Sequence, residues 1–103
     1  MVAIVYTTTN NVQDARKIAH ILVEEQLVAC VNVIPNIESV YRWKGNIEEE
    51  NEFLILAKTV DKNIEKTIDR IKQFHSYELP DIVVLPIIGG LKDYLDYIDI
   101  NTA

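Results

Sequence analysis

The sequence predicts an α+β fold in which strands and helices follow one another in the order β-α-β-β-α-β, with a short closing helix. Three observations predict it. Runs of apolar and β-branched residues near both ends of the chain are typical of strands. Two stretches repeat apolar residues at helical spacing. Between them, a turn signal joins two long strand-like runs, which predicts a hairpin. With 103 residues, 49% of them apolar, the chain can bury one core, and we expect a single domain over residues 1–103.

The first strand and the first helix are marked at the start of the chain. The run Val2–Tyr6 is continuously apolar and Thr7–Thr9 extends its β propensity, which indicates a buried central strand. Asn11 is a good helix N-cap, and Asp14 follows three residues later, close to a capping box. Apolar residues then recur at helical spacing, and we expect the helix to end near Gln26.

A long hairpin is expected over residues 29–59, with its turn at Lys44-Gly45-Asn46. Two registers fit this signal, one with Trp43 opposite Glu48 and the other with a three-residue loop. We favour the three-residue loop, which places Trp43 opposite Ile47, because register follows the hydrophobic face. That register gathers five apolar residues on one face: Ile37, Tyr41, Trp43, Ile47 and Phe53. It leaves Arg42 and Glu48 paired on the other face.

This hairpin is too long for its own domain. At ~3.3 Å per residue, the strand from Ala29 to Trp43 reaches roughly 50 Å, whereas a compact chain of this length is about 34 Å across. The tip should therefore project, with a bulge or bend at Pro35, which lacks the ladder donor. Tyr41 and Trp43 lie near the tip, and each ring can bury about 200 Å², worth roughly 5 kcal/mol. We expect a second copy of the chain to cover them.

The second half of the chain completes the pattern. Phe53–Ala57 is apolar on both faces, so the return strand should end inside the core. Asp61 is expected to cap a second helix. The inner stripe of that helix consists of Ile64, Ile68, Ile71 and Phe74. After an irregular connection, Ile82–Ile88 predicts a fourth strand, and Pro86 confines it to an edge or a bulge. A short helix built on Leu91, Tyr94, Leu95 and Ile98 closes the chain.

Two helices of similar length must cover one face of such a sheet. The right-handed crossover rule then leaves a short list of topologies, headed by the ferredoxin-like split β-α-β sandwich. In that arrangement the fourth strand lies at an edge, where Pro86 is tolerated.

Composition excludes several classes of function. The formal net charge of −6 argues against a nucleic-acid partner, including RNA, because phosphate binding depends on clustered Lys and Arg. No apolar run approaches the ~20 residues that span a bilayer, so we expect no membrane partner. The start MVAIVYTTT has no basic flank and no cleavage site, so we expect no signal peptide. A single Cys fits a reducing compartment.

Cys30 and His75 are the candidate metal ligands. Cys30 lies in an apolar strand, which fits a small buried hydrophobe; the alternative is a soft metal ligand or redox thiol, although no second Cys lies near. His75 ends the second helix, where the macrodipole favours a histidine. The alternative is an imidazole ligand for copper or zinc, completed across a subunit interface.

No catalytic site is evident in the sequence, and we expect no enzyme. Ser39 and Ser76 lack flanking elbow glycines. A small hydrolase on this fold would need an Arg and an anion-cradling loop, and the connection TTTNN at residues 7–11 has neither Arg nor Gly. The acidic run at Glu48, Glu49, Glu50 and Glu52 lacks the spacing of a calcium loop and better fits a charged strand that blocks edge-to-edge aggregation. A scaffold whose task is assembly stays open.

Four segments in this order and spacing resemble the CutA family of divalent-cation tolerance proteins: ACVNVIP, S-V-Y-x-W-K-G, E-x-x-F-L-x-x-A-K-T and H-S-Y-E-L-P-D. The resemblance covers essentially the whole chain. It implies a ferredoxin-like subunit in a homotrimer, where strands of neighbouring subunits extend one another's sheets. It also implies a cytoplasmic protein that meets copper and other divalent cations without a required cofactor. The trimer shape is similar to that of nitrogen-regulatory signalling proteins, which suggests signalling.

The resemblance carries over to individual residues only in part. Some family members have a Cys near the end of the first strand, where this chain has Thr7, and a His-His pair where it has Phe74-His75. His75 alone matches that copper site, and Cys30 matches the family's cysteine in the second strand. Other matching residues are placed around subunit contacts or clefts, as is Tyr41 on the hairpin: Trp43, Tyr77, Glu78, Pro80 and Tyr94.

Overall fold

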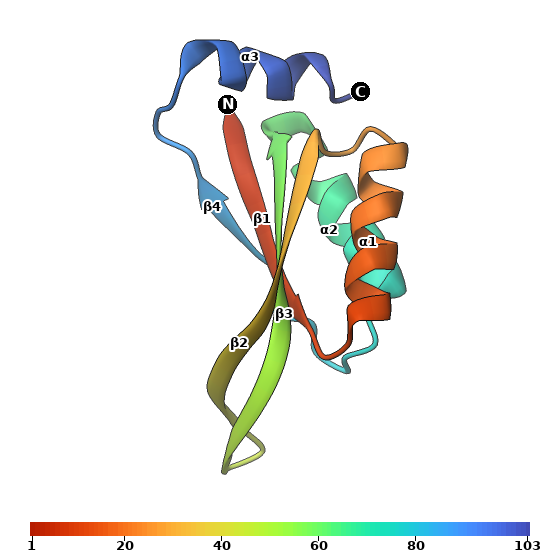
Figure 1. Cartoon of the computed structure of the whole chain (residues 1–103), viewed down its shortest axis with the longest axis vertical. Coiled ribbons are helices and arrows are strands. Elements are labelled where there is room, and N and C mark those ends of the chain that lie inside the picture. The colour runs from red at the N-terminus through yellow and green to blue at the C-terminus, as the bar shows by residue number, and fades with distance from the viewer.

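The computed structural model describes residues 1–103 and shows an α+β chain with one four-stranded antiparallel sheet, in the order β2-β3-β1-β4. The elements follow the predicted order along the chain: β1 (Val2–Thr9), α1 (Val12–Glu24), β2 (Cys30–Trp43), β3 (Asn46–Val60), a 3₁₀ turn (Asp61–Asn63), α2 (Ile64–Phe74), β4 (Val83–Pro86) and α3 (Lys92–Ile100). The helices α1 and α2 lie side by side on one face of the sheet, and α3 lies across the end where both termini are found (Figure 1). None of these helices combines the length and the apolar character that crossing a bilayer requires.

The core lies between the sheet and the two helices on its face. β1 is a central strand between β3 and β4, as predicted, and its alternate residues Val5 and Thr7 are fully buried. The core cluster consists of Val5, Ala15, Ile18, Leu22, Val28, Ile55, Ala57 and Ile71. Ile4 and Tyr6 point to the opposite face and are only half-buried. The sheet therefore has one covered face and one open face.

The two predicted helix caps have different outcomes. Asn11 caps α1 as expected, because its side chain accepts a hydrogen bond of 2.8 Å from the N–H of Asp14. The expectation that Asp61 caps the second helix is wrong. Asp61 opens the 3₁₀ turn instead, three residues before α2 begins, and its carboxylate lies 3.5 Å from the amino group of Met1. From there it is too early in the chain to reach the free N–H groups of α2.

The predicted three-residue loop of the hairpin is also wrong. Trp43 pairs with Asn46 rather than Ile47, which leaves only Lys44 and Gly45 in the loop. Both have positive φ, 50° and 83°. Such a two-residue turn matches the twist of its flanking strands, whereas grouping of apolar residues is worth little on a solvated arm. Turn chemistry therefore decided the register.

The observed register changes which residues face one another across the arm. Tyr41 lies opposite Glu48, and Arg42 lies opposite Ile47, so the expected Arg42–Glu48 pair does not form. The bulge predicted at Pro35 is confirmed by a register shift between Ile34 and Ile37.

The arm projects as expected, but its aromatic face is not free. The molecule measures 44 × 25 × 22 Å, and the β2-β3 hairpin extends beyond the rest of the chain (Figure 1). Tyr41 is 38% exposed and Trp43 is half-buried, because both line a pocket together with residues 76–79 and 81 of the same chain. The expectation that a sister molecule covers these rings can apply only to the surface that remains exposed.

Candidate functional site

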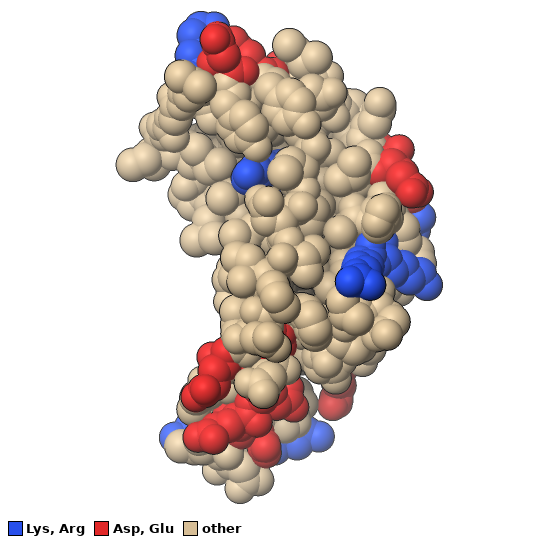
Figure 2. Space-filling model, viewed as in Figure 1, with Lys and Arg blue, Asp and Glu red and all other residues tan.

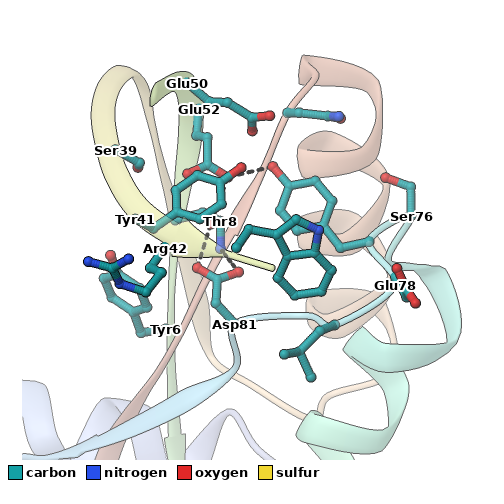
Figure 3. Close-up of a pocket in the computed structure, with 14 residues that line it drawn as sticks. Tyr6, Thr8, Ser39, Tyr41, Arg42, Glu50, Glu52, Ser76, Glu78 and Asp81 are labelled. Atoms are coloured by element: carbon teal, nitrogen blue, oxygen red, sulfur yellow. Dashed lines mark hydrogen bonds between the residues drawn. The ribbon is translucent and has the colours of Figure 1, made fainter. Parts of the chain in front are cut away.

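A pocket of about 560 Å³ lies where the hairpin curls toward the loop after α2. It opens on the face of the sheet opposite α1 and α2, because Tyr6 and Thr8 of β1 alternate with Val5 and Thr7, which face the core. β2, β3 and the loop supply the other walls. The lining side chains are Tyr6, Thr8, Asn10, Ser39, Tyr41, Arg42, Trp43, Glu50, Glu52, Ser76, Tyr77, Glu78, Leu79 and Asp81 (Figure 3).

Thr8 connects two carboxylates in this pocket. Its hydroxyl oxygen lies 2.5 Å from Oδ2 of Asp81 and 3.1 Å from Oε2 of Glu52, and its backbone N–H donates to Oδ1 of Asp81 at 3.3 Å. Glu52 and Asp81 lie on two sides of Thr8 (Figure 3). A hydroxyl has one proton, so it can donate to only one of the two carboxylates at a time.

Glu52 is the buried carboxylate of the site. It is only 5% exposed, and burying a carboxylate is costly unless donors surround it. Its Oε2 receives the hydroxyl of Tyr77 in addition to its contact with Thr8, whereas Oε1 receives no hydrogen bond from the chain. One oxygen of a buried carboxylate in the pocket lining therefore has no donor.

The carboxylates affect the tyrosines around them. Burial, together with the hydrogen bond to Glu52, raises the pKa of Tyr77 far above its ordinary value of 10.0. Partial burial and the nearby Glu50 also raise the pKa of Tyr41. Both hydroxyls consequently keep their protons and act as hydrogen-bond donors beside a negative surface.

His75 has a structural position at the edge of the pocket. Its Nδ1 accepts the N–H of Tyr77 at 3.2 Å, which leaves the proton on Nε2, and Nε2 lies 2.7 Å from the carbonyl oxygen of Thr8 as its donor. The His75 and Tyr77 rings are in contact, with centroids 4.6 Å apart. Both ring nitrogens are therefore engaged within the chain.

Cys30 lies elsewhere. It is half-buried on β2, opposite Lys58 of β3, which in turn pairs with Ile4 of β1. His75 contacts Thr8, four residues further along β1, or roughly 13 Å at ~3.3 Å per residue. The two predicted metal ligands cannot meet on one ion within one chain, since ligand distances are about 2.0–2.3 Å. No three His, Cys, Asp or Glu side chains in the structure gather closely enough to hold a metal ion.

The structure brings together four of the six residues predicted around subunit contacts or clefts. They all line the pocket: Tyr41, Trp43, Tyr77 and Glu78. Pro80 belongs to the same loop, next to Asp81. Tyr94 lies at the other end of the molecule, where its hydroxyl is 3.1 Å from Nζ of Lys58.

Sequence reasoning missed Thr8, Glu52 and Asp81. Glu52 was assigned to a solvated acidic strand together with its neighbours. Its position directly before the apolar stretch that begins at Phe53 was the available signal, because the arm enters the body of the molecule there. Thr8 and Asp81 are 73 residues apart, and nothing local in the sequence links them.

Comparisons with known proteins agree over the whole chain. A family model described as CutA1 divalent ion tolerance protein matches residues 3–101. The divalent-cation tolerance protein CutA of Thermus thermophilus is 44% identical over 103 residues, all of both chains. The chain spans about half of some relatives, such as the chloroplastic CutA of Arabidopsis thaliana, with 37% identity over 54% of that protein.

Solved structures of CutA proteins also have the same fold as this chain. The structure of the Thermus thermophilus divalent cation tolerance protein has a TM-score of 0.96, with 44% identity and full coverage of both chains. The structure of CutA from Archaeoglobus fulgidus, described as a periplasmic divalent cation tolerance protein, has a TM-score of 0.93 with 40% identity over 98% of each chain.

Proposed function

This chain belongs to the CutA1 divalent ion tolerance family, and we propose that it is a homotrimeric, non-catalytic protein of the cytoplasm that binds divalent cations. We class its single domain, residues 1–103, as a ferredoxin-like subunit. The strand order β2-β3-β1-β4 and the two helices on one face support this class. The single Cys supports a reducing compartment, and fractionation of cells against periplasmic and cytoplasmic markers tests it.

Exposed apolar side chains support assembly into a homotrimer. The middle of the face shown in Figure 2 is largely uncharged. β4 is an edge strand whose four residues are all exposed, and edge strands with apolar side chains pair with other chains unless they are protected. Further large apolar residues are more than half exposed in one chain: Val40, Ile47, Leu79, Ile88, Leu91 and Ile100. Light scattering after size exclusion should give three times the 11.8 kDa of one chain; a monomer at micromolar concentration contradicts the proposal.

The charge around the pocket carries the proposal of cation binding. Four carboxylates line it, from Glu50, Glu52, Glu78 and Asp81, against one guanidinium, from Arg42. Acidic side chains also gather over the hairpin (Figure 2). Such a region concentrates cations near it.

Copper would use softer donors, and we propose His75 and Cys30 of neighbouring subunits for it. Copper at His75 must compete with the two hydrogen bonds of its ring. Calorimetry with Cu²⁺ on the unmodified protein, on His75→Ala and on Cys30→Ser tests this. A weaker affinity in both variants supports the assignment, and an unchanged affinity in either variant removes that residue from the site.

A second candidate function is the binding of a small molecule, with metal binding incidental. One observation favours it: the pocket is far larger than a bare ion needs and has aromatic walls, which is typical of small-molecule sites. Its walls include the projecting arm, so occupancy could be reported to a partner, which is the signalling role that the family resemblance implies.

A further inference from the structure

The lining of the pocket calls for hydrogen-bond donors. Glu52 is nine-tenths buried, its Oε2 is shared by Thr8 and Tyr77, and its Oε1 receives no donor. Asp81 receives only Thr8 among the protein donors. Glu52 Oε1 is open to the pocket, because the fully buried side-chain oxygens without a partner are those of Thr7 and Thr67. A ligand N–H group can therefore reach it, and a charge-assisted hydrogen bond to a largely buried carboxylate is stronger than one at the surface.

The charge of the pocket calls for a cation. Lys44 offsets one of the four lining carboxylates, because its ammonium lies 3.8 Å from Glu78. Glu50, Glu52 and Asp81 form no salt bridge with a Lys or Arg of the chain. Burial first, and then the carboxylates of Glu50 and Glu52, raise the pKa of both Tyr41 and Tyr77. A positively charged ligand is therefore favoured over a neutral or anionic one.

The walls distinguish an organic cation from a bare metal ion. No three carboxylate, thiol or imidazole groups converge on one point, whereas Tyr6, Tyr41, Trp43 and Tyr77 present aromatic surface around a volume of about 560 Å³. Aromatic faces attract organic cations. Oε1 of Glu52, which has no donor, favours a primary ammonium among organic cations. A primary ammonium offers three N–H donors, whereas a quaternary ammonium offers none.

We infer that this pocket binds a small molecule with a primary ammonium group, which donates to Glu52 and Asp81 while its apolar body lies against Tyr41 and Trp43. This inference rests on the second candidate function, small-molecule binding, and goes beyond divalent-cation binding by naming the chemistry of the ligand.

The single tryptophan makes the test direct. Trp43 is the only Trp in the chain and it lines the pocket, so its fluorescence reports occupancy. Phenethylammonium is titrated into the chelator-treated protein, with 2-phenylethanol as the neutral match and benzyltrimethylammonium as a cation without N–H groups. We expect saturable binding of phenethylammonium and at least tenfold weaker binding of both controls.

Matched variants locate the ammonium. Glu52→Gln preserves shape but removes the charge, and it should weaken phenethylammonium binding at least tenfold. Glu49→Gln makes the same change on the same strand, outside the pocket lining, and should alter affinity less than twofold. Thermal unfolding checks that each variant folds. If Glu52→Gln does not fold, Asp81→Asn takes its place with the same expected weakening.

Each contrary result overturns the inference in a distinct way. Equal affinity for 2-phenylethanol preserves a small-molecule pocket but removes the ammonium. If benzyltrimethylammonium binds as tightly as phenethylammonium, N–H donation does not contribute to binding. If Glu52→Gln and Glu49→Gln weaken binding equally, the ammonium does not contact Glu52. No saturable response to any of the three probes rejects the small-molecule site itself, while copper calorimetry on His75→Ala judges the divalent-cation proposal independently.

Discussion

The two halves of β3 are built from one strand but have opposite environments. Residues 53–60 lie between β2 and β1 and are buried or half-buried, whereas residues 46–51 pair only with β2 on the arm and are mostly exposed. Glu52 stands at the boundary and is 5% exposed. The comparison shows that what packs against a strand, rather than its strand character, determines burial. Residues 53–60 have two neighbouring strands, whereas Glu52 pairs only with β2 and is covered by Thr8 and Tyr77, and the pocket forms where the two environments meet.

The largest expected effect comes from a matched pair of isoleucines on this strand. Ile55 is fully buried and Ile47 is 66% exposed. Ile55→Ala should lower the free energy of unfolding by about 2–5 kcal/mol, because it removes buried methyl groups and leaves a cavity. Ile47→Ala should change it by less than about 0.5 kcal/mol if Ile47 stays exposed in the trimer as it is in one chain. Denaturant titrations at one fixed protein concentration measure both, and similar losses would show that another molecule buries the arm.

Glu52, at the boundary between the two halves of β3, is expected to have the next largest effect. Glu52→Ala leaves Thr8 and Tyr77 without their shared acceptor and should cost about 1–3 kcal/mol. Glu49→Ala removes an exposed carboxylate from the same run and should cost less than about 0.5 kcal/mol. Urea unfolding of the two variants compares them. Equal stability would mean that Glu52 belongs to the arm rather than to the body.

The turn of the arm offers a smaller and more local change. Gly45 has φ +83°, so Gly45→Ala should cost about 1–2 kcal/mol through left-handed backbone strain. Hydrogen exchange should rise at arm amides and stay constant in the body, because the strain is confined to the hairpin. Gly89→Ala is the control, since no atom lies within 4 Å of the added Cβ and φ is not left-handed. Faster exchange throughout the body would refute the separation of the two regions.

The smallest effect is a pH dependence. Folding raises the pKa of Tyr77 above its ordinary value of 10.0, chiefly through burial. Above pH 10 the unfolded chain therefore loses a proton that the folded chain keeps, so this contribution to stability is present below pH 10 and declines as pH rises. Unfolding midpoints between pH 9 and 11 should fall more steeply for the unmodified protein than for Tyr77→Phe. Parallel curves would place Tyr77 in contact with solvent.

Local signals in the sequence predicted the elements but not their register or partners. The Asn11 cap, the bulge at Pro35 and the edge position of Pro86 each depend on the backbone chemistry of a few adjacent residues, and all three are confirmed. The hairpin register failed because the prediction followed the apolar face, whereas the observed loop holds only Lys44 and Gly45. Both residues have positive φ, which the apolar pattern does not encode.

The candidate site was predicted less well, because its contacts join distant segments. Trp43 and Tyr77 were recognised as residues of interest, yet their common pocket depends on the arm curling toward the loop after α2. His75 was considered as a helix-terminal histidine or a metal ligand, and only the tertiary structure shows that Thr8 and Tyr77 occupy both of its ring nitrogens. Asp81 reaches Thr8 across 73 residues of chain.

By itself the sequence determined the order of strands and helices, the reach of the hairpin and the acidity of its arm, because periodicity, chain length and charge are additive along a chain. Only the tertiary structure decided that one glutamate of an acidic run is buried while its neighbours are solvated. That difference arises from which strands and loops pack around Glu52. Packing between distant segments depends on the whole fold, so no local stretch of residues determines it.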